Sequence, residues 1–233
     1  KLKKIYGLID LRNNKSFGPT EYYTGQTSEG KFNYVRSLNG KSKLENFRST
    51  CKKIQGTEGT LWGAKPPSSP GSSLWIFNSH LCKPMQLMYD KNSTKLNSFT
   101  YRYRIDPGQF KVKDRPENLC FCPKDETQKR CEGIFFMKQC LSGAPMVLSN
   151  PHFYDTPHLL KQVRGLSPDY EKHIGFLEAE RTIGATVEIG IRVQLNLDMQ
   201  RTKSLQAMRN FPSTIMPYIW FEEGAILSGW VKN

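Results

Sequence analysis

The chain has 233 residues, enough for one large domain or two small ones, and 37% of them are hydrophobic. This composition excludes an intrinsically disordered protein. The formal net charge is +13, and the whole excess lies in residues 1–131, which carry 24 Lys and Arg against 11 Asp and Glu. A basic region of this kind indicates nucleic acid, anionic lipid or an acidic protein as a partner, or only a well-solvated surface.

The first residues, Lys1-Leu2-Lys3-Lys4, include no initiator Met and no signal-peptide pattern. No stretch approaches the roughly 18 apolar residues that span a bilayer. We therefore expect a processed or trimmed piece. If the parent protein is membrane-bound, its transmembrane helices lie outside this sequence.

Strand patterns run through the first two thirds of the chain. A weak strand over Phe32–Leu38 ends in Asn39-Gly40, which is a strong turn signal. The Gly-, Pro- and Ser-rich residues 63–73 are typical of a loop. Apolar and polar residues alternate from Ser98 to Ile105, which predicts a half-buried strand. Shorter strands are predicted over Leu74–Phe77, Ile134–Met137 and Pro145–Leu148.

The last third combines short helices with one long strand. Thr156 and Pro157 before Gly165 predict a helix over His158–Arg164. A second short helical turn starts at Ser167-Pro168-Asp169. A third helix candidate is Ser204–Asn210. Strict period-two alternation of apolar residues predicts a long strand with one buried and one wet face. Its apolar residues are Val187, Ile189, Ile191, Val193, Leu195, Leu197 and Met199.

The six cysteines all lie within residues 51–140, and an even number confined to one segment favours disulfides in an oxidising compartment. Two N-glycosylation acceptors, at Asn14 and Asn92, agree with this compartment. Asn92 lies in the polar stretch Asp90–Ser98, which we expect to form an exposed turn. A zinc cluster around Cys120, Cys122, Cys131 and Cys140 is the competing interpretation. The single residue between Cys120 and Cys122 is shorter than the usual spacer in structural zinc sites, so we expect no metal. A direct Cys120–Cys122 bridge would be strained, and the composition does not choose among the other pairings.

The sequence contains no convincing active site. The histidines have no metal-ligand spacing, and no P-loop, nucleophile elbow or dinucleotide-binding motif is present. His152 lies three residues before Asp155, and Glu178 and Glu180 share one face of a possible strand. Such pairs are more often structural than catalytic. We therefore expect neither an enzyme nor a cofactor, and no nucleic-acid partner, because nucleic-acid motifs are absent and the cysteines indicate another compartment.

Several motifs resemble, in order and spacing, those of the class B scavenger receptors. They begin with Cys51 and Gly56-Thr57-Glu58-Gly59, and continue with Asn118-Leu119-Cys120-Phe121-Cys122 and Ser149-Asn150-Pro151-His152-Phe153-Tyr154. Gly165-Leu166-Ser167-Pro168, His173, Glu180 and Gly184 follow. The last motifs are Arg192-Val193-Gln194-Leu195-Asn196 and the run from Met216 to Gly224. The matches cover nearly the whole chain.

The resemblance implies a mainly β fold, an irregular antiparallel β-barrel with a few short peripheral helices. The chain would be a single segment, 1–233, from the C-terminal half or so of an extracellular or lumenal ectodomain, with the disulfide-bonded region 51–140 inside it. The helical apex that the family uses for partner binding would be missing. By analogy, the implied disulfides are Cys51–Cys120, Cys82–Cys140 and Cys122–Cys131.

The same resemblance implies a cell-surface receptor that binds fatty acids, sterols or lipoprotein lipid and passes them through an internal tunnel to the membrane. The long strand supplies tunnel candidates at Val187, Ile189, Ile191, Val193 and Leu195, although such a row can equally belong to an ordinary core. The alternative is a lysosomal trafficking receptor, on the lumenal side of the membrane, that binds an enzyme. A protein ligand is compatible with both.

Overall fold

The computed structural model describes residues 18–26, 29–79, 81–140, 145–201, 206, 209–210 and 212–227. The strands are β1 (Thr20–Tyr22), β2 (Val35–Leu38), β3 (Ser73–Asn78), β4 (Lys83–Lys95), β5 (Ser98–Ile105), β6 (Phe135–Phe136), β7 (Met146–Ser149), β8 (Phe176–Glu180), β9 (Thr186–Met199) and β10 (Thr214–Ile226). The α-helices are α1 (Pro157–Leu160) and α2 (Tyr170–His173). Short 3₁₀ helices are η1 (Glu29–Lys31), η2 (Ser49–Lys52), η3 (Pro107–Phe110), η4 (Pro116–Phe121), η5 (Met137–Gln139) and η6 (Pro151–Phe153).

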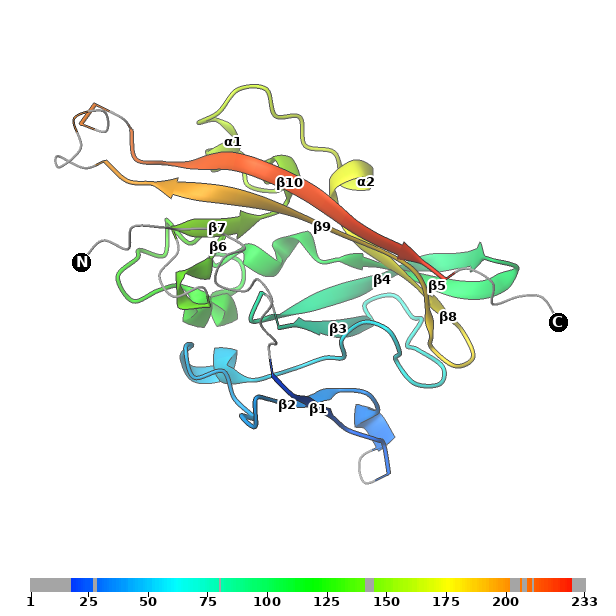
Figure 1. The fold of residues 1–233 in the computed structure, drawn as a ribbon. Helices are drawn as coiled ribbons and strands as arrows, with labels where there is room; N and C mark the ends of the chain where they lie inside the picture. Colours follow the sequence, from blue (N-terminus) through cyan, green and yellow to red (C-terminus); the bar gives the residue numbers. More distant parts are fainter. Residues whose placement is uncertain are drawn as a thin grey trace.

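Eight of these strands form one antiparallel sheet, in the order β3-β4-β5-β8-β9-β7-β6, with β10 on the other side of β9. β9 is the centre of the sheet, because it pairs with β8 along its first half, β7 along its second half and β10 along nearly its whole length. Figure 1 shows β9 and β10 crossing the molecule as a long ribbon, with α1 and α2 on one side and the small β1–β2 sheet at the far side. The expected mainly β, antiparallel fold with few short helices is confirmed. Within the described strands the hydrogen-bonded path stays open, and closure into a barrel is not seen.

Three apolar clusters hold the sheet to the segments around it. The first lies on one face of β3, β4, β5 and β8 and includes Leu87, Tyr103 and Leu177, which are almost completely buried. The second joins α1 and the Cys122–Cys131 region to β7 and β10, and the third joins η2, η3 and η5 to β7. Burial of this apolar surface is the main stabilising contribution to the fold.

The long strand predicted over Val187–Met199 is confirmed as β9, but the expected wet face is wrong in its second half. Gln194 is 2% exposed and Asn196 is fully buried. Asn196 Nδ2 donates to Val147 O at 3.1 Å and Ser149 Oγ at 3.0 Å, and Gln194 Nε2 donates to Asn196 Oδ1 at 2.8 Å. The neighbouring β7 and η6 cover this face, and the polar side chains are paired within the interior.

Other elements differ from the sequence expectations in extent. β4 was not predicted, because its second half is polar and was interpreted as a turn from Asp90 to Ser98; the turn lies at Leu96 and Asn97, which have positive φ. The helix expected over His158–Arg164 is the shorter α1. β10 was missed as a strand, and β8 was indicated only as a possible strand at Glu178 and Glu180. The third helix candidate, Ser204–Asn210, lies largely outside the described residues.

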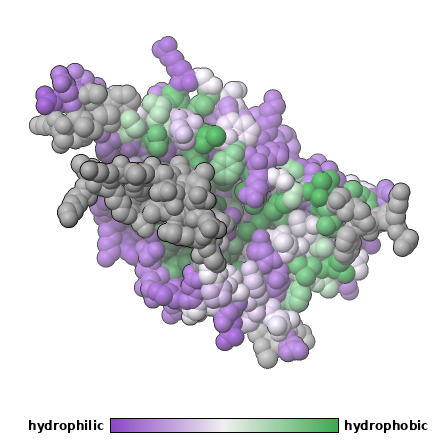
Figure 2. Space-filling view, viewed as in Figure 1, coloured by the Kyte–Doolittle hydropathy of each residue, from purple (hydrophilic) through white to green (hydrophobic). Residues whose placement is uncertain are grey.

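β10 is an edge strand with unusual exposure. Tyr218, Ile219, Trp220 and Phe221 are successive large side chains, each 39% exposed or more, and Ile226 is exposed as well. Since successive residues of a strand point to opposite faces, β10 is open on both faces. Figure 2 shows apolar surface along the course of β10 on the visible side of the molecule.

Candidate functional site

The disulfide region lies on the side of the sheet where η2, η4 and η5 meet. The structure contains the bonds Cys51–Cys120 and Cys122–Cys131, both implied by the family resemblance. For the third implied pair, the Cys140 sulfur lies 3.5 Å from the carbonyl oxygen of Leu81, the residue before Cys82. Cys82 and Cys140 also pack against the same apolar cluster. The Cys82–Cys140 bond stays a prediction.

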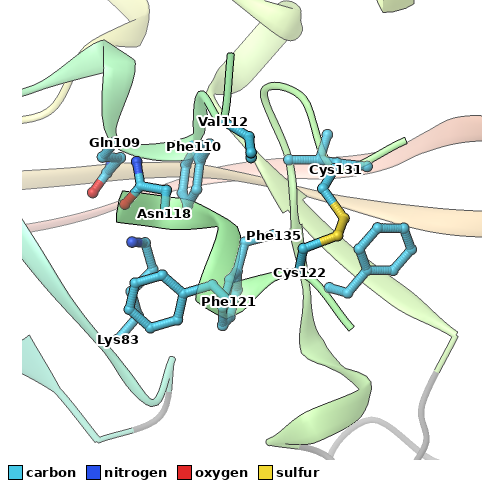
Figure 3. Close-up of a pocket in the computed structure, with 11 residues that line it drawn as sticks. Lys83, Gln109, Phe110, Val112, Asn118, Phe121, Cys122, Cys131 and Phe135 are labelled. Carbon is cyan, nitrogen blue, oxygen red and sulfur yellow. A yellow bond between two sulfur atoms is a disulfide. The ribbon is translucent and has the colours of Figure 1, made fainter. Parts of the chain in front are cut away.

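A small cavity beside this region is lined by a buried lysine. Lys83, the first residue of β4, is 5% exposed, and its Nζ lies 3.9 Å from the centre of the Phe121 ring. Figure 3 shows the Lys83 amine between that ring and the side chain of Asn118. The cavity volume is about 10 Å³, which is room for about one water molecule. This cavity is therefore too small to be the site of an organic ligand.

The electrostatics around Lys83 disfavour its charged form. The pKa of the Lys83 amine is lowered to about 7, chiefly by burial and also by the charge of Arg115, whereas Asp106 acts in the opposite direction. Arg115 Nη1 and Asp106 Oδ2 are only 2.5 Å apart, so Asp106 is largely engaged elsewhere. Gln109 Oε1, which also faces this region, is buried without a hydrogen-bond partner in the described part of the chain. A water in the cavity would satisfy such a group.

A much larger apolar cleft lies between the segment 61–67, the loop before β2 and the turn between β8 and β9. Its volume is about 930 Å³, within the usual range of ligand pockets. The cleft is lined mainly by aromatic, aliphatic and proline side chains: Phe32, Tyr34, Leu61, Trp62, Pro66, Pro67, Leu74 and Ile183. Lys65 is the single charged residue among those that line it in the described part of the chain. Burial raises the pKa of the Tyr34 phenol, which therefore stays neutral.

Backbone hydrogen bonds hold the wall of this cleft in place. Trp62 N donates to Gly184 O at 2.9 Å, and Lys65 N donates to Thr182 O at 3.2 Å. On the other side, Asn33 Nδ2 donates to Leu61 O at 2.9 Å. Gly184 has φ +71°, and a Cβ there would lie 2.1 Å from Gly63 O, so this approach requires glycine. The wall is therefore fixed to both the sheet and the loop before β2.

None of the five tunnel candidates lines this cleft. Val187 and Val193 are buried, whereas Ile189, Ile191 and Leu195 are half-buried. Ile189 and the cleft residue Trp62 pack against the same apolar cluster. The tunnel assignment stays a prediction. The sequence did not indicate the cleft, because its lining comes from four separate segments that only tertiary folding brings together.

The two glycosylation acceptors differ in what the structure says of them. Asn92 is exposed, but it lies within β4 rather than in the expected turn, and its Oδ1 accepts a hydrogen bond from Tyr89 Oη at 2.9 Å. Asn14 lies outside the described residues. Whether either asparagine carries a glycan stays a prediction.

In the described part of the chain, no group of three or more His, Cys, Asp or Glu side chains is arranged to hold a metal ion. The helices found among the described residues are all too short to cross a bilayer.

Comparison with known proteins identifies the family. The profile of the CD36 family matches residues 1–233. The chain is 31% identical over 231 residues to scavenger receptor class B member 1 of Mus musculus, covering 98% of this chain and 44% of that protein. It is also 33% identical over 195 residues to sensory neuron membrane protein 1 of Plutella xylostella, covering 83% of this chain and 36% of that protein. The chain thus spans less than half the length of the curated relatives it matches, and it belongs to the CD36 family.

Proposed function

We propose that this chain is part of a lipid-receptor ectodomain and that the cleft lined by Phe32 and Trp62 holds the apolar part of a lipid. The observation that carries the proposal is the cleft itself, with a volume of about 930 Å³ and a largely aromatic and aliphatic wall. An acyl chain or sterol needs a continuous apolar wall of this kind. The receptor names of the relatives agree with binding rather than catalysis.

The single lysine among the lining residues favours an amphiphile with an anionic head. Lys65 is exposed at the cleft, and no carboxylate lines it in the described part of the chain. A fatty acid could place its carboxylate near Lys65 and its acyl chain along the aromatic wall. The ion pair would be solvent-exposed, so it would add little affinity and mainly select the charged head.

In the proposed receptor, the ectodomain lies on the extracellular side of the cell membrane and is anchored by segments outside this chain. Lipid would pass from the cleft towards the membrane along the apolar row of β9. Ile189 supports this route, because it packs against the same apolar cluster as the cleft residue Trp62.

Fatty-acid binding to the full-length protein tests the proposal. Phe32→Ser removes one aromatic wall of the cleft, and we expect about tenfold weaker binding of a fluorescent fatty acid. Phe99→Ser is the matched control, because Phe99 is 66% exposed on β5 and does not line the cleft. Lys65→Gln should weaken fatty-acid binding by about threefold and leave binding of the methyl ester unchanged. Equal affinities for wild type, Phe32→Ser and Phe99→Ser would refute the cleft as the site.

A further inference from the structure

Two histidine rings stack against each other on the face of the sheet that carries α2. His152 of η6 and His173 of α2 have ring centres 4.2 Å apart and planes inclined by 13°. The indole of Trp220, on the exposed strand β10, meets both rings edge-on, at 6.0 Å from His152 and 5.6 Å from His173. These three side chains therefore join η6, α2 and the edge strand of the sheet.

The hydrogen bonds of the pair fix the protonation state of both rings. His152 Nδ1 accepts the backbone N–H of Ser167 at 2.9 Å, and His173 Nδ1 accepts the backbone N–H of Asp169 at 2.8 Å. A ring nitrogen that accepts an N–H carries no proton of its own. A proton on either Nδ1 would turn that attraction into a clash between two donors.

The backbone around His152 is strained and depends on these contacts. His152, Phe153 and Asp155 all have φ between +52° and +62°. Non-glycine residues adopt this region only where their surroundings hold them there. One such contact comes from β9, where Gln194 Oε1 accepts the backbone N–H of His152 at 2.8 Å.

The charged groups that face the pair come from three elements and comprise two cations and two carboxylates. α2 contributes Asp169 and Lys172, and β9 contributes Arg192. Glu222 of β10 neutralises part of the Arg192 charge, because Arg192 Nε donates to Glu222 Oε2 at 2.6 Å. Burial and the neighbouring His152 lower the pKa of His173, Arg192 and Lys172 act in the same direction, and Asp169 opposes them.

We propose that the stacked His152–His173 pair is an acid-sensitive latch that holds the segment 164–170 against the sheet at neutral pH and releases it on acidification. Two protonated imidazoles 4.2 Å apart repel each other, and both Nδ1 acceptors are lost. The end of α2 stays attached, because Arg192 Nη1 donates to Glu171 O at 2.7 Å and to Ile174 O at 3.1 Å. Release therefore begins at Ser167 and Asp169 and uncovers the His152 side of β9 and β10.

Hydrogen exchange of the full-length protein, measured by mass spectrometry on peptides covering residues 164–174, tests the latch. Between about pH 7 and about pH 5, we expect the protection of this segment, corrected for the intrinsic exchange rate, to fall by about tenfold. The double variant His152→Asn and His173→Asn keeps an oxygen acceptor near each Nδ1 position but does not titrate. Its protection should not change with pH. His158→Asn, on α1, is the control and should behave as wild type.

An acid-induced loss of protection that persists in the double variant would overturn the proposal, as would equal wild-type protection at both pH values. If the double variant does not fold, the wild-type protein still decides. Protonated imidazole quenches indole fluorescence, so Trp220 emission should fall on acidification, and Trp220→Phe should remove that fall. NMR spectra in which neither imidazole takes up a proton between about pH 7 and about pH 5 would also overturn the latch.

Discussion

At the scale of single residues, Lys83 places an amine in the interior of the protein. Folding therefore lowers the pKa of this amine. The pKa of this amine is 10.5 in the unfolded chain and about 7 in the folded protein. Between these values the unfolded chain binds more protons, so the stability of the protein rises with pH across this window. Below pH 7 the amine is charged in both states, and burying that charge lowers the free energy of unfolding by an amount on the order of 5 kcal/mol.

Lys83→Met should therefore stabilise the protein at pH 6 by several kcal/mol, and the gain should shrink as the pH approaches 10. Met has a similar length and volume, and it keeps contact with Phe121. Urea denaturation of the full-length protein at several pH values measures this. Lys91→Met, at an exposed position of the same strand β4, is the matched control and should change stability little. A gain that is the same at every pH would show that packing, not ionisation, is responsible.

Asn196 shows the opposite case, a buried polar residue whose partners are all present. Asn196→Ala would remove the nearer acceptor of Gln194 Nε2 and the nearer donor to Ser149 Oγ, and leave only the long 3.4 Å hydrogen bond between those two atoms in a closed interior. We expect a loss of about 2–4 kcal/mol in the free energy of unfolding. Asn92→Ala, at an exposed position of β4, should change it by about 0.5 kcal/mol or less. A small effect at Asn196 would indicate that water enters this face of β9.

At the scale of elements, β9 was predictable and its surroundings were not. The alternation from Val187 to Met199 determines a strand from local sequence alone. The pattern does not say that β7 and η6 cover the polar face, because those contacts join segments about 45 residues apart. β4 escaped prediction for a related reason: its polar second half is stabilised by pairing with β5, not by a buried apolar row of its own.

The apolar row of β9 leads to a test of the tunnel at the same scale. In a packed core, Ile191→Trp should destabilise the protein by about 1–3 kcal/mol through overpacking. In a tunnel wall, the larger side chain should leave folding nearly intact and reduce lipid uptake. Thermal unfolding and lipid transfer to vesicles, measured on the same variant, separate the two. Normal folding with lipid uptake at the wild-type rate would exclude Ile191 from a tunnel.

At the scale of the whole molecule, the disulfides join parts of the chain that the sheet does not. Cys51–Cys120 spans 69 residues and ties η2 to η4, whereas Cys122–Cys131 spans only 9. In the chain-entropy description, the long bridge is worth about 4 kcal/mol and the short one about 3 kcal/mol. We therefore expect the double variant that lacks the long bridge, Cys51→Ala and Cys120→Ala, to lose more free energy of unfolding. The double variant that lacks the short bridge, Cys122→Ala and Cys131→Ala, should lose less. Urea denaturation of both double variants measures which disulfide contributes more to the free energy of unfolding. A larger loss for the short bridge would show that local packing, not chain entropy, determines the stabilisation.

The third cysteine pair, Cys82 and Cys140, decides whether all six cysteines form disulfides. Non-reducing peptide mapping of the full-length protein should yield a peptide that links Cys82 to Cys140, alongside the two bonds already described. The physical basis is position: Cys140 lies against the carbonyl of Leu81, and both cysteines pack on one cluster. Such a bond would tie the start of β4 to η5 and hold the wall of the Lys83 cavity from a second side. Recovery of Cys82 and Cys140 as unmodified thiols would contradict this pairing and leave the other two bonds unaffected. Recovery of all six cysteines as thiols would contradict the oxidising compartment itself, because structural disulfides resist reduction there.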